Sequence, residues 1–135
     1  MKKIAGKKTR RASGSTANNA GSTARGLRRV TLRNERRTDG SWLNLWAHLD
    51  EEGCLHIDGQ DLGPVTRSVS SDGEYEYFMT IAAADVPRLV ELLGGGPGED
   101  ILGLLRRKWT CEKSYELEDL LRKSGIRTAL TTYGG

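Results

Sequence analysis

Residues 42–56 hold the side chains of this chain that are best suited to chemistry: two tryptophans, both histidines and one of the two cysteines. Imidazole and thiolate bind Zn²⁺ well, so His48, Cys54 and His56 are candidate ligands, with Cys111 as a fourth from the C-terminal half. Structural zinc sites usually pair their ligands at short spacings such as Cys-x-x-Cys, which this sequence lacks. We therefore expect no metal and no other cofactor, and a zinc site built from these four residues is the alternative.

The same residues do not form a catalytic pattern. Cys54 follows three acidic residues, whose charge opposes formation of a thiolate. Cys111 follows three basic residues, but no histidine lies near it in the sequence. The glycine-rich residues 94–98 lack the lysine and hydroxyl residue of a phosphate-binding loop and lead into Glu99 and Asp100. We therefore expect no catalytic residue and a protein that is not an enzyme.

The turn at residues 50–53 predicts how these side chains are arranged. Asp50 suits the first position of a type I turn, and Gly53 suits a left-handed bulge position, so the two flanking segments should form a β-hairpin. The resulting register places His48 opposite His56 and Trp46 opposite Asp58. One face of the hairpin then carries Leu43, Leu45, Ala47, Leu49, Leu55 and Ile57. The other carries Trp42, Asn44, Trp46, His48, Cys54, His56 and Asp58.

This second face is the candidate site, because tryptophan is enriched at the energetic centres of protein interfaces. Two alternatives remain: the tryptophans belong to a core covered on both sides, or they stack on nucleic acid bases. For a protein partner, the candidate contacts are the residues of this face and the acidic residues near it. They are Trp42, Trp46, His48, Asp50, Glu51, Glu52, His56, Asp58 and Asp61.

Charge divides the chain into two parts. Residues 1–37 hold twelve Lys and Arg and one acidic residue, whereas residues 38–135 hold nine Lys and Arg and seventeen Asp and Glu. Residues 1–26 are poor in apolar side chains, so we expect a disordered basic tail followed by a single domain over residues 27–135. The tail could bind nucleic acid, act as a targeting peptide or have no role. The candidate residues for nucleic acid are Lys2, Lys3, Lys7, Lys8, Arg10, Arg11, Arg28 and Arg29.

Periodicity predicts the fold class. Strands are expected around residues 30–33, extending as far as 37, at 42–49, from 55 to a break at 58–64, and at 74–81. Helices are expected from residue 86 to 93, from 101 to 109 and from a cap at Ser114 to Gly125, before a last strand at 126–133. The expectation is an α+β domain in which an antiparallel sheet of four to five strands has its helices packed on one face. The absence of a long apolar run or signal sequence predicts a cytoplasmic protein without a membrane partner.

Three segments, WAHLDEEGCLHIDGQDLG, EYEYFMTIAAADVPRLVELLG and SYELEDLLRKSGI, together resemble small uncharacterised proteins of high-GC actinobacteria. Some proteins of that size and organisation are immunity or inhibitor-like partners of toxins. The resemblance spans residues 28–135 and transfers no functional residue. With the acidic domain, it predicts a binding protein whose partner is a basic protein, such as a nuclease or another toxin. Nucleic acid binding through the tail is the alternative function, and an enzyme of unidentified reaction is the third.

Overall fold

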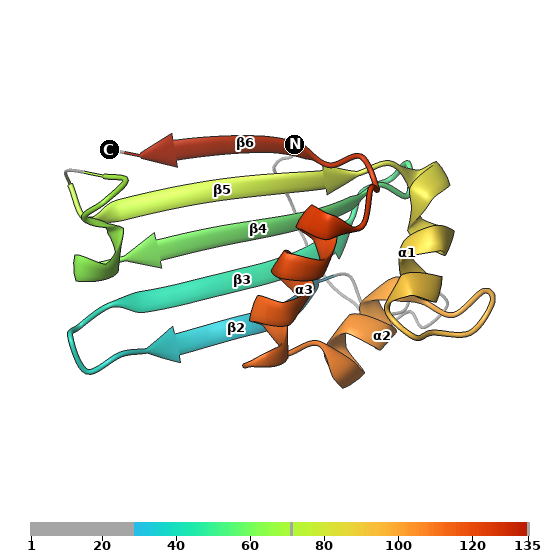
Figure 1. The fold of residues 1–135 in the computed structure, drawn as a ribbon, viewed down its shortest axis with the longest axis horizontal. Coiled ribbons are helices and arrows are strands. Elements are labelled where there is room, and N and C mark those ends of the chain that lie inside the picture. The colour runs from blue at the N-terminus through green and yellow to red at the C-terminus, as the bar shows by residue number, and fades with distance from the viewer. Residues whose placement is uncertain (1–28, 71, 135) are drawn as a thin grey trace.

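The computed structural model describes residues 29–70 and 72–134, which form an α+β fold. Five antiparallel strands lie in chain order across one sheet, and three helices lie between the fourth strand and the last (Figure 1). This confirms the predicted fold class. The strands are β2 (Arg29–Arg36), β3 (Trp42–Leu49), β4 (Leu55–Leu62), β5 (Glu74–Ile81) and β6 (Ala129–Gly134). The helices are α1 (Val86–Leu92), α2 (Ile101–Lys108) and α3 (Lys113–Lys123), with short 3-10 turns η2 (Pro64–Thr66) and η3 (Ala83–Asp85).

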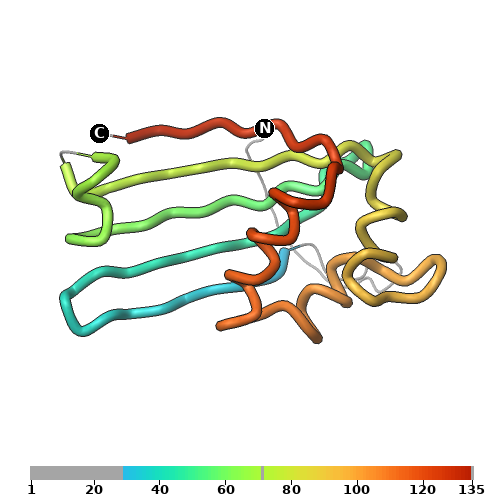
Figure 2. The backbone as a smooth tube through the Cα atoms, viewed as in Figure 1, coloured from blue at the N-terminus to red at the C-terminus, as the bar shows by residue number. Residues whose placement is uncertain are grey.

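Tight turns connect β2 to β3 and β3 to β4, and a longer segment over residues 63–73, which contains η2, connects β4 to β5. The backbone forms a simple meander with β2 at one edge and β6 at the other (Figure 2). Glycines with positive φ, which other residues rarely adopt, lie in each of these connections, including Gly40 at 92° and Gly53 at 86°. The predicted register of the β3–β4 hairpin is confirmed, with His48 opposite His56 and Trp46 opposite Asp58.

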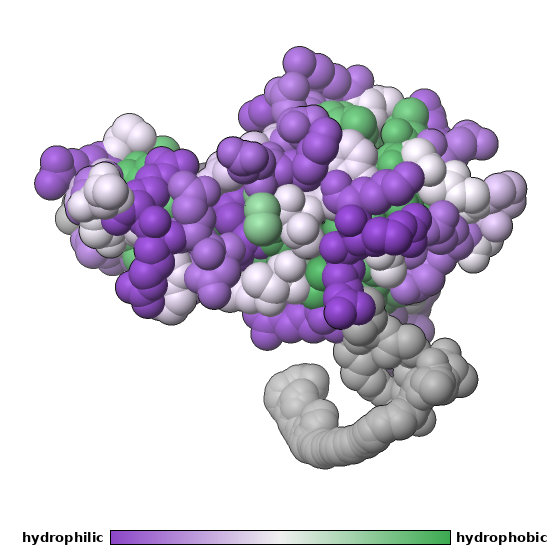
Figure 3. Space-filling model, turned by 90° about the horizontal axis from the view of Figure 1, so that it is seen from below, coloured by the Kyte–Doolittle hydropathy of each residue, from purple (hydrophilic) through white to green (hydrophobic). Residues whose placement is uncertain are grey.

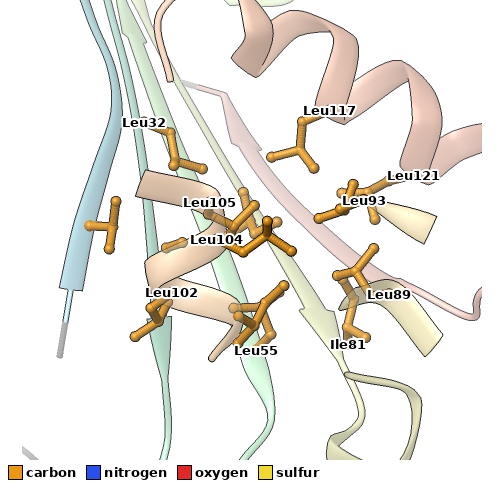
Figure 4. Packing of buried hydrophobic residues seen from close by; sticks show 14 of the residues in the cluster. Leu32, Leu55, Ile81, Leu89, Leu93, Leu102, Leu104, Leu105, Leu117 and Leu121 are labelled. Carbon is orange, nitrogen blue, oxygen red and sulfur yellow. The ribbon is translucent and has the colours of Figure 1, made fainter. Parts of the chain in front are cut away.

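The helices cover one face of the sheet and bury the aliphatic side chains beneath them. Asp100 begins α2 by accepting a hydrogen bond from the Gly103 amide, and basic residues occupy the last turn, as the helix dipole favours. Leu104 and Leu105 of α2 and Leu117 of α3 are fully buried against residues of the strands (Figure 4). This apolar layer fixes which face of each strand points away from the helices.

Three sequence expectations need correction. The first strand does not alternate regularly, because a bulge between Thr31 and Arg33 shifts its register and turns Arg33 toward the helices. Strand β4 continues to Leu62 instead of breaking at residue 58. Ser114 lies inside α3 rather than capping it, where its hydroxyl donates to the Cys111 carbonyl. The predicted tail, residues 1–26, lies outside the described residues.

Candidate functional site

The β3–β4 turn holds the candidate face in register. The Asp50 amide donates to the Cys54 carbonyl at 3.0 Å, and the Gly53 amide donates to the Asp50 carbonyl at 3.0 Å. One carboxylate oxygen of Asp50 accepts from the amides of Glu52 and Cys54. The acidic side chain that begins the turn is therefore a structural part of it, and it leaves its second oxygen for a histidine.

The sheet face opposite the helices is called here the open face. By register, its members on β2 to β6 are Arg29, Thr31, Asn34, Arg36, Trp42, Asn44, Trp46, His48, His56, Asp58, Gln60, Leu62, Glu74, Glu76, Phe78, Thr80, Ala129, Thr131 and Tyr133. Within residues 29–70 and 72–134, no helix packs on this face, since all three helices join the core on the other side. The predicted clustering of tryptophan and histidine is therefore present on one sheet surface.

The two histidines form a stacked pair. Their ring centroids lie 4.7 Å apart with an interplanar angle of 11°. His56 also contacts the second carboxylate oxygen of Asp50 at 2.7 Å through Nε2, and the Thr80 hydroxyl at 3.2 Å through Nδ1. Because both of its ring nitrogens are engaged, His56 is held in one orientation. The contact between His56 and Thr80 could not be predicted from the β3–β4 hairpin alone, because Thr80 belongs to β5.

Burial and neighbouring charges act on the pKa of the second histidine. Burial lowers the pKa of His48, and the neighbouring His56 and Arg29 act in the same direction, while Asp58 opposes them. Burial likewise raises the pKa of Asp58, which lies 3.6 Å from the His48 ring nitrogen. Burial also acts to raise the pKa of Asp50, but the hydrogen bond from His56 and two backbone amides outweigh it and lower that pKa. The two carboxylates of the cluster are thus shifted in opposite directions, with the pKa of Asp50 lowered and that of Asp58 raised.

Each tryptophan of the open face lies against an arginine of β2. The guanidinium of Arg29 is 4.7 Å from the ring centroid of Trp46, and that of Arg36 is 4.0 Å from the ring centroid of Trp42. The Trp42 indole also donates to the Asn34 side chain at 2.6 Å. Both tryptophans are half-buried, so they are less buried than a core residue and less exposed than a fully accessible surface residue. The arginine contacts preorganise the rings as flat apolar surfaces bordered by positive charge.

The remaining candidate residues are distributed differently. Glu51 and Glu52 are exposed in the hairpin turn, beside the histidine pair. Asp61 lies opposite Leu43 and Tyr75, on the face toward the helices, so it is separated from the open face. Its Oδ1 is buried without a hydrogen bond, and burial raises its pKa. Of the basic residues expected to bind nucleic acid, only Arg29 lies within the described part of the chain.

The four residues of the alternative metal set are not gathered in one place. In the part of the chain that the structure describes, the one group with ligand atoms within 4.8 Å of one another is Asp50, Glu52 and Cys54. Neither histidine belongs to it, and Asp50 already uses one oxygen to hold the turn. Cys111 is exposed in the α2–α3 connection, where its amide donates to the Leu32 carbonyl on β2. The geometry therefore gives no support to a site built from these four residues.

A polar cluster under α3 was missed by the sequence reasoning. Arg33 is 3% exposed, donates to Ser114 at 2.9 Å and to Glu118 at 2.6 Å, and lies 3.6 Å from the Tyr115 ring centroid. Burial acts to lower the pKa of Arg33, but Glu118 outweighs it and raises that pKa. The bulge that turns Arg33 inward leaves no local signal in the sequence. Its partners join β2 to α3, which indicates a structural role and removes Arg33 from the residues available to nucleic acid.

None of the helices among the described residues has the length and apolarity needed to span a bilayer. Comparison of the chain with models of protein families, with curated proteins and with solved structures found no match.

Proposed function

We propose that the chain is a non-enzymatic binding protein, of immunity or inhibitor-like kind, whose acidic domain binds a basic protein through the open face. The observation that carries this proposal is the pair of half-buried tryptophans, held flat by Arg29 and Arg36 on a sheet face that no described helix covers. Rigid aromatic side chains bind at a small entropic cost, which is why they dominate interface energetics.

Charge supports a basic partner. Residues 38–135 carry an excess of eight acidic side chains, because seventeen Asp and Glu face nine Lys and Arg. The exposed Glu51 and Glu52 lie at the turn end of the open face, and Glu74 lies on the face itself. The net acidic charge of residues 38–135 attracts a basic protein during diffusion and raises its association rate, even though Arg29 and Arg36 place positive charge beside the two tryptophans. A basic nuclease or another toxin that binds nucleic acid fits this description.

The histidine cluster gives the open face a fixed shape beside Trp46. Both ring nitrogens of His56 are engaged, by Asp50 and Thr80, and the ring stacks on His48. A surface that is already held rigid loses little entropy when a partner binds.

The test begins with affinity capture of the partner by the full-length chain from cells of the source organism, followed by titration of the purified pair. Trp46→Ala should weaken binding by about thirtyfold, as expected when an interface centre is truncated. Leu92→Ala is the matched control, because Leu92 is 43% exposed on α1 in the helical layer, and its affinity should equal that of the wild type. Capture of no protein, or equal affinities for Trp46→Ala and the wild type, would refute the proposal.

Charge is tested separately. Reversal of the turn acids, Glu51→Lys with Glu52→Lys, should slow association and reduce its dependence on salt, because steering is electrostatic. Glu91→Lys, which reverses an exposed acid on α1, is the control. If reversal of Glu51 and Glu52 alters the association rate no more than Glu91→Lys does, the partner is not selected by its positive charge.

A nucleic-acid-associated function is the second candidate, favoured by the contact of Arg29 with Trp46 at the start of β2, which follows the basic residues 1–28 in the sequence. Aromatic and arginine side chains can stack on unpaired bases. The full chain should then shift single-stranded oligonucleotides, with an affinity that falls steeply as salt rises, and removal of residues 1–28 should abolish the shift. Absence of salt-dependent binding excludes this function.

A further inference from the structure

The two edges of the sheet differ in their protection against pairing with another chain. Edge strand β2 has a bulge and several charged side chains, and its Leu32 carbonyl accepts a hydrogen bond from the Cys111 amide. The side of the molecule on which β2 lies is largely hydrophilic (Figure 3). Bulges, charges and covering segments are the devices that prevent association through an edge.

Within the described residues, edge strand β6 has none of these devices. Its sequence, ALTTYG, contains no charged residue and no proline, and all six residues are exposed. Among the described strands it pairs only with β5, so its outer backbone groups face away from the sheet. A regular, neutral edge of this kind is a template for a further strand.

Apolar side chains gather at the same edge. Four large hydrophobic residues of the described chain are exposed, and two of them, Leu130 at 62% and Tyr133 at 60%, lie on β6. A third, Val69, is 53% exposed beside the end of the strand, where its carbonyl lies 2.8 Å from the position a Cβ would take on Gly134. A groove between α3 and the sheet, lined partly by Met79 and Leu121, extends this surface from Leu130.

We propose that β6 pairs antiparallel with β6 of a second copy of this chain, which joins two five-stranded sheets into one. The pairing is isologous, so each copy gives and receives the same contacts. Because opposed residues share a face, the two-fold axis runs perpendicular to the sheet and both helical layers lie on the same side. The exposed Leu130 side chains of the two copies then lie on one face of the joint, beside the two grooves.

Charges at the two ends of β6 are complementary in this arrangement. Arg127 precedes the strand and is exposed, while Glu76 lies opposite Tyr133 near its other end. Antiparallel pairing brings Arg127 of each copy beside the end of the strand where Glu76 of the other copy lies. The neutral strand itself places no like charges against each other. These features favour a second copy over an unrelated strand as the occupant of the edge.

The proposal is tested by the mass of the full chain in solution. Sedimentation velocity over roughly 1 µM to 1 mM should show a shift from the 14.9 kDa monomer to twice that mass, since one pair of strands buries less area than a standard interface. Leu130→Lys should remain monomeric throughout. Leu92→Lys, with the same substitution at an exposed site on α1, should dimerise like the wild type. A monomer at every concentration overturns the proposal.

A charge exchange tests the orientation of the two strands and does not depend on Leu130. Arg127→Glu and Glu76→Arg should each weaken dimerisation by about tenfold, and the double variant should recover it, because the attraction is restored with reversed sign. Circular dichroism confirms that each variant is folded. A dimer that Leu130→Lys leaves intact but Trp46→Ala abolishes would use the open face and would refute pairing through β6, as would a double variant that recovers nothing.

Discussion

Gly59 gives the sharpest test of the packing beneath α3. A Cβ built on this residue would lie 2.1 Å from the Tyr77 ring, which crosses the β4 backbone at this point. Tyr77 lies opposite Gly59 in the register and is 9% exposed, and its hydroxyl accepts a hydrogen bond from Arg33 at 3.5 Å. In Gly59→Ala the ring must move by roughly 1.3 Å to reach an ordinary van der Waals contact, which breaks the contact with Arg33.

The expected cost follows from these two losses. Overpacking a dense region costs about 1–3 kcal/mol, and a lost buried hydrogen bond costs about 1 kcal/mol. We expect Gly59→Ala to lower the free energy of unfolding by about 3 kcal/mol, which corresponds to a decrease in Tm of roughly 15 °C for a domain of this size. Urea titration and thermal unfolding, both followed by circular dichroism, measure the two quantities.

A control and a double variant make the test specific. Gly96→Ala introduces the same methyl group where no atom lies within 4 Å and φ is not positive, so its stability should equal or slightly exceed that of the wild type. In Gly59→Ala combined with Tyr77→Ala, the clash is absent, so the combined loss should be smaller than the sum of the separate losses. Stability of Gly59→Ala within about 0.5 kcal/mol of the wild type would refute the placement of the ring over Gly59.

Three further predictions concern other contacts. Arg33→Met should lower the free energy of unfolding by about 3 kcal/mol in denaturant titrations, because it leaves the partly buried Glu118 carboxylate without its cation. Asp100→Ala removes the side-chain cap of α2 and should cost about 1 kcal/mol in the same assay, whereas Asp85→Ala, at the start of α1 where no such bond exists, should cost less than half of that. Burial lowers the pKa of His48 from its ordinary value of 6.5, so the unfolded chain binds the proton first as pH falls. The stability that neutral His48 contributes is complete above pH 6.5 and is lost as pH falls through the lower pKa of the folded state. Thermal unfolding between about pH 8 and pH 5 should therefore show a steeper decrease of Tm for the wild type than for His48→Gln. Equal slopes would contradict a lowered pKa for His48.

Local patterns were sufficient for much of the sheet. A turn that begins with Asp50 and places Gly53 in the left-handed region permits one hairpin register, and that register sorts Trp46 and His48 onto one face. Periodicity over residues 74–81 likewise predicted strand β5. Side-chain direction has a period of two in a strand, so a correct turn determines the direction of every following residue.

Local patterns failed where the deciding contact comes from a distant segment. Gly59 reads as a strand breaker, but it continues β4 because the Tyr77 ring from β5 covers it. Ser114 reads as a helix cap, but it lies one residue inside α3 and accepts a hydrogen bond from Arg33, 81 positions away. The bulge in β2 that allows this contact exchanges the faces to which the following side chains point, and no glycine in the strand marks its position.

The sequence by itself therefore determined the fold class, the β3–β4 register and the gathering of tryptophan and histidine on one face, because each depends on interactions between near neighbours. Only the tertiary structure decided what surrounds that face. It placed all three helices on the other side, set an arginine of β2 against each tryptophan and joined His56 to Thr80 of β5. It also separated Asp61 from the face and left β6 as an uncharged edge. These outcomes depend on the order of strands and the packing of layers, which no local pattern encodes.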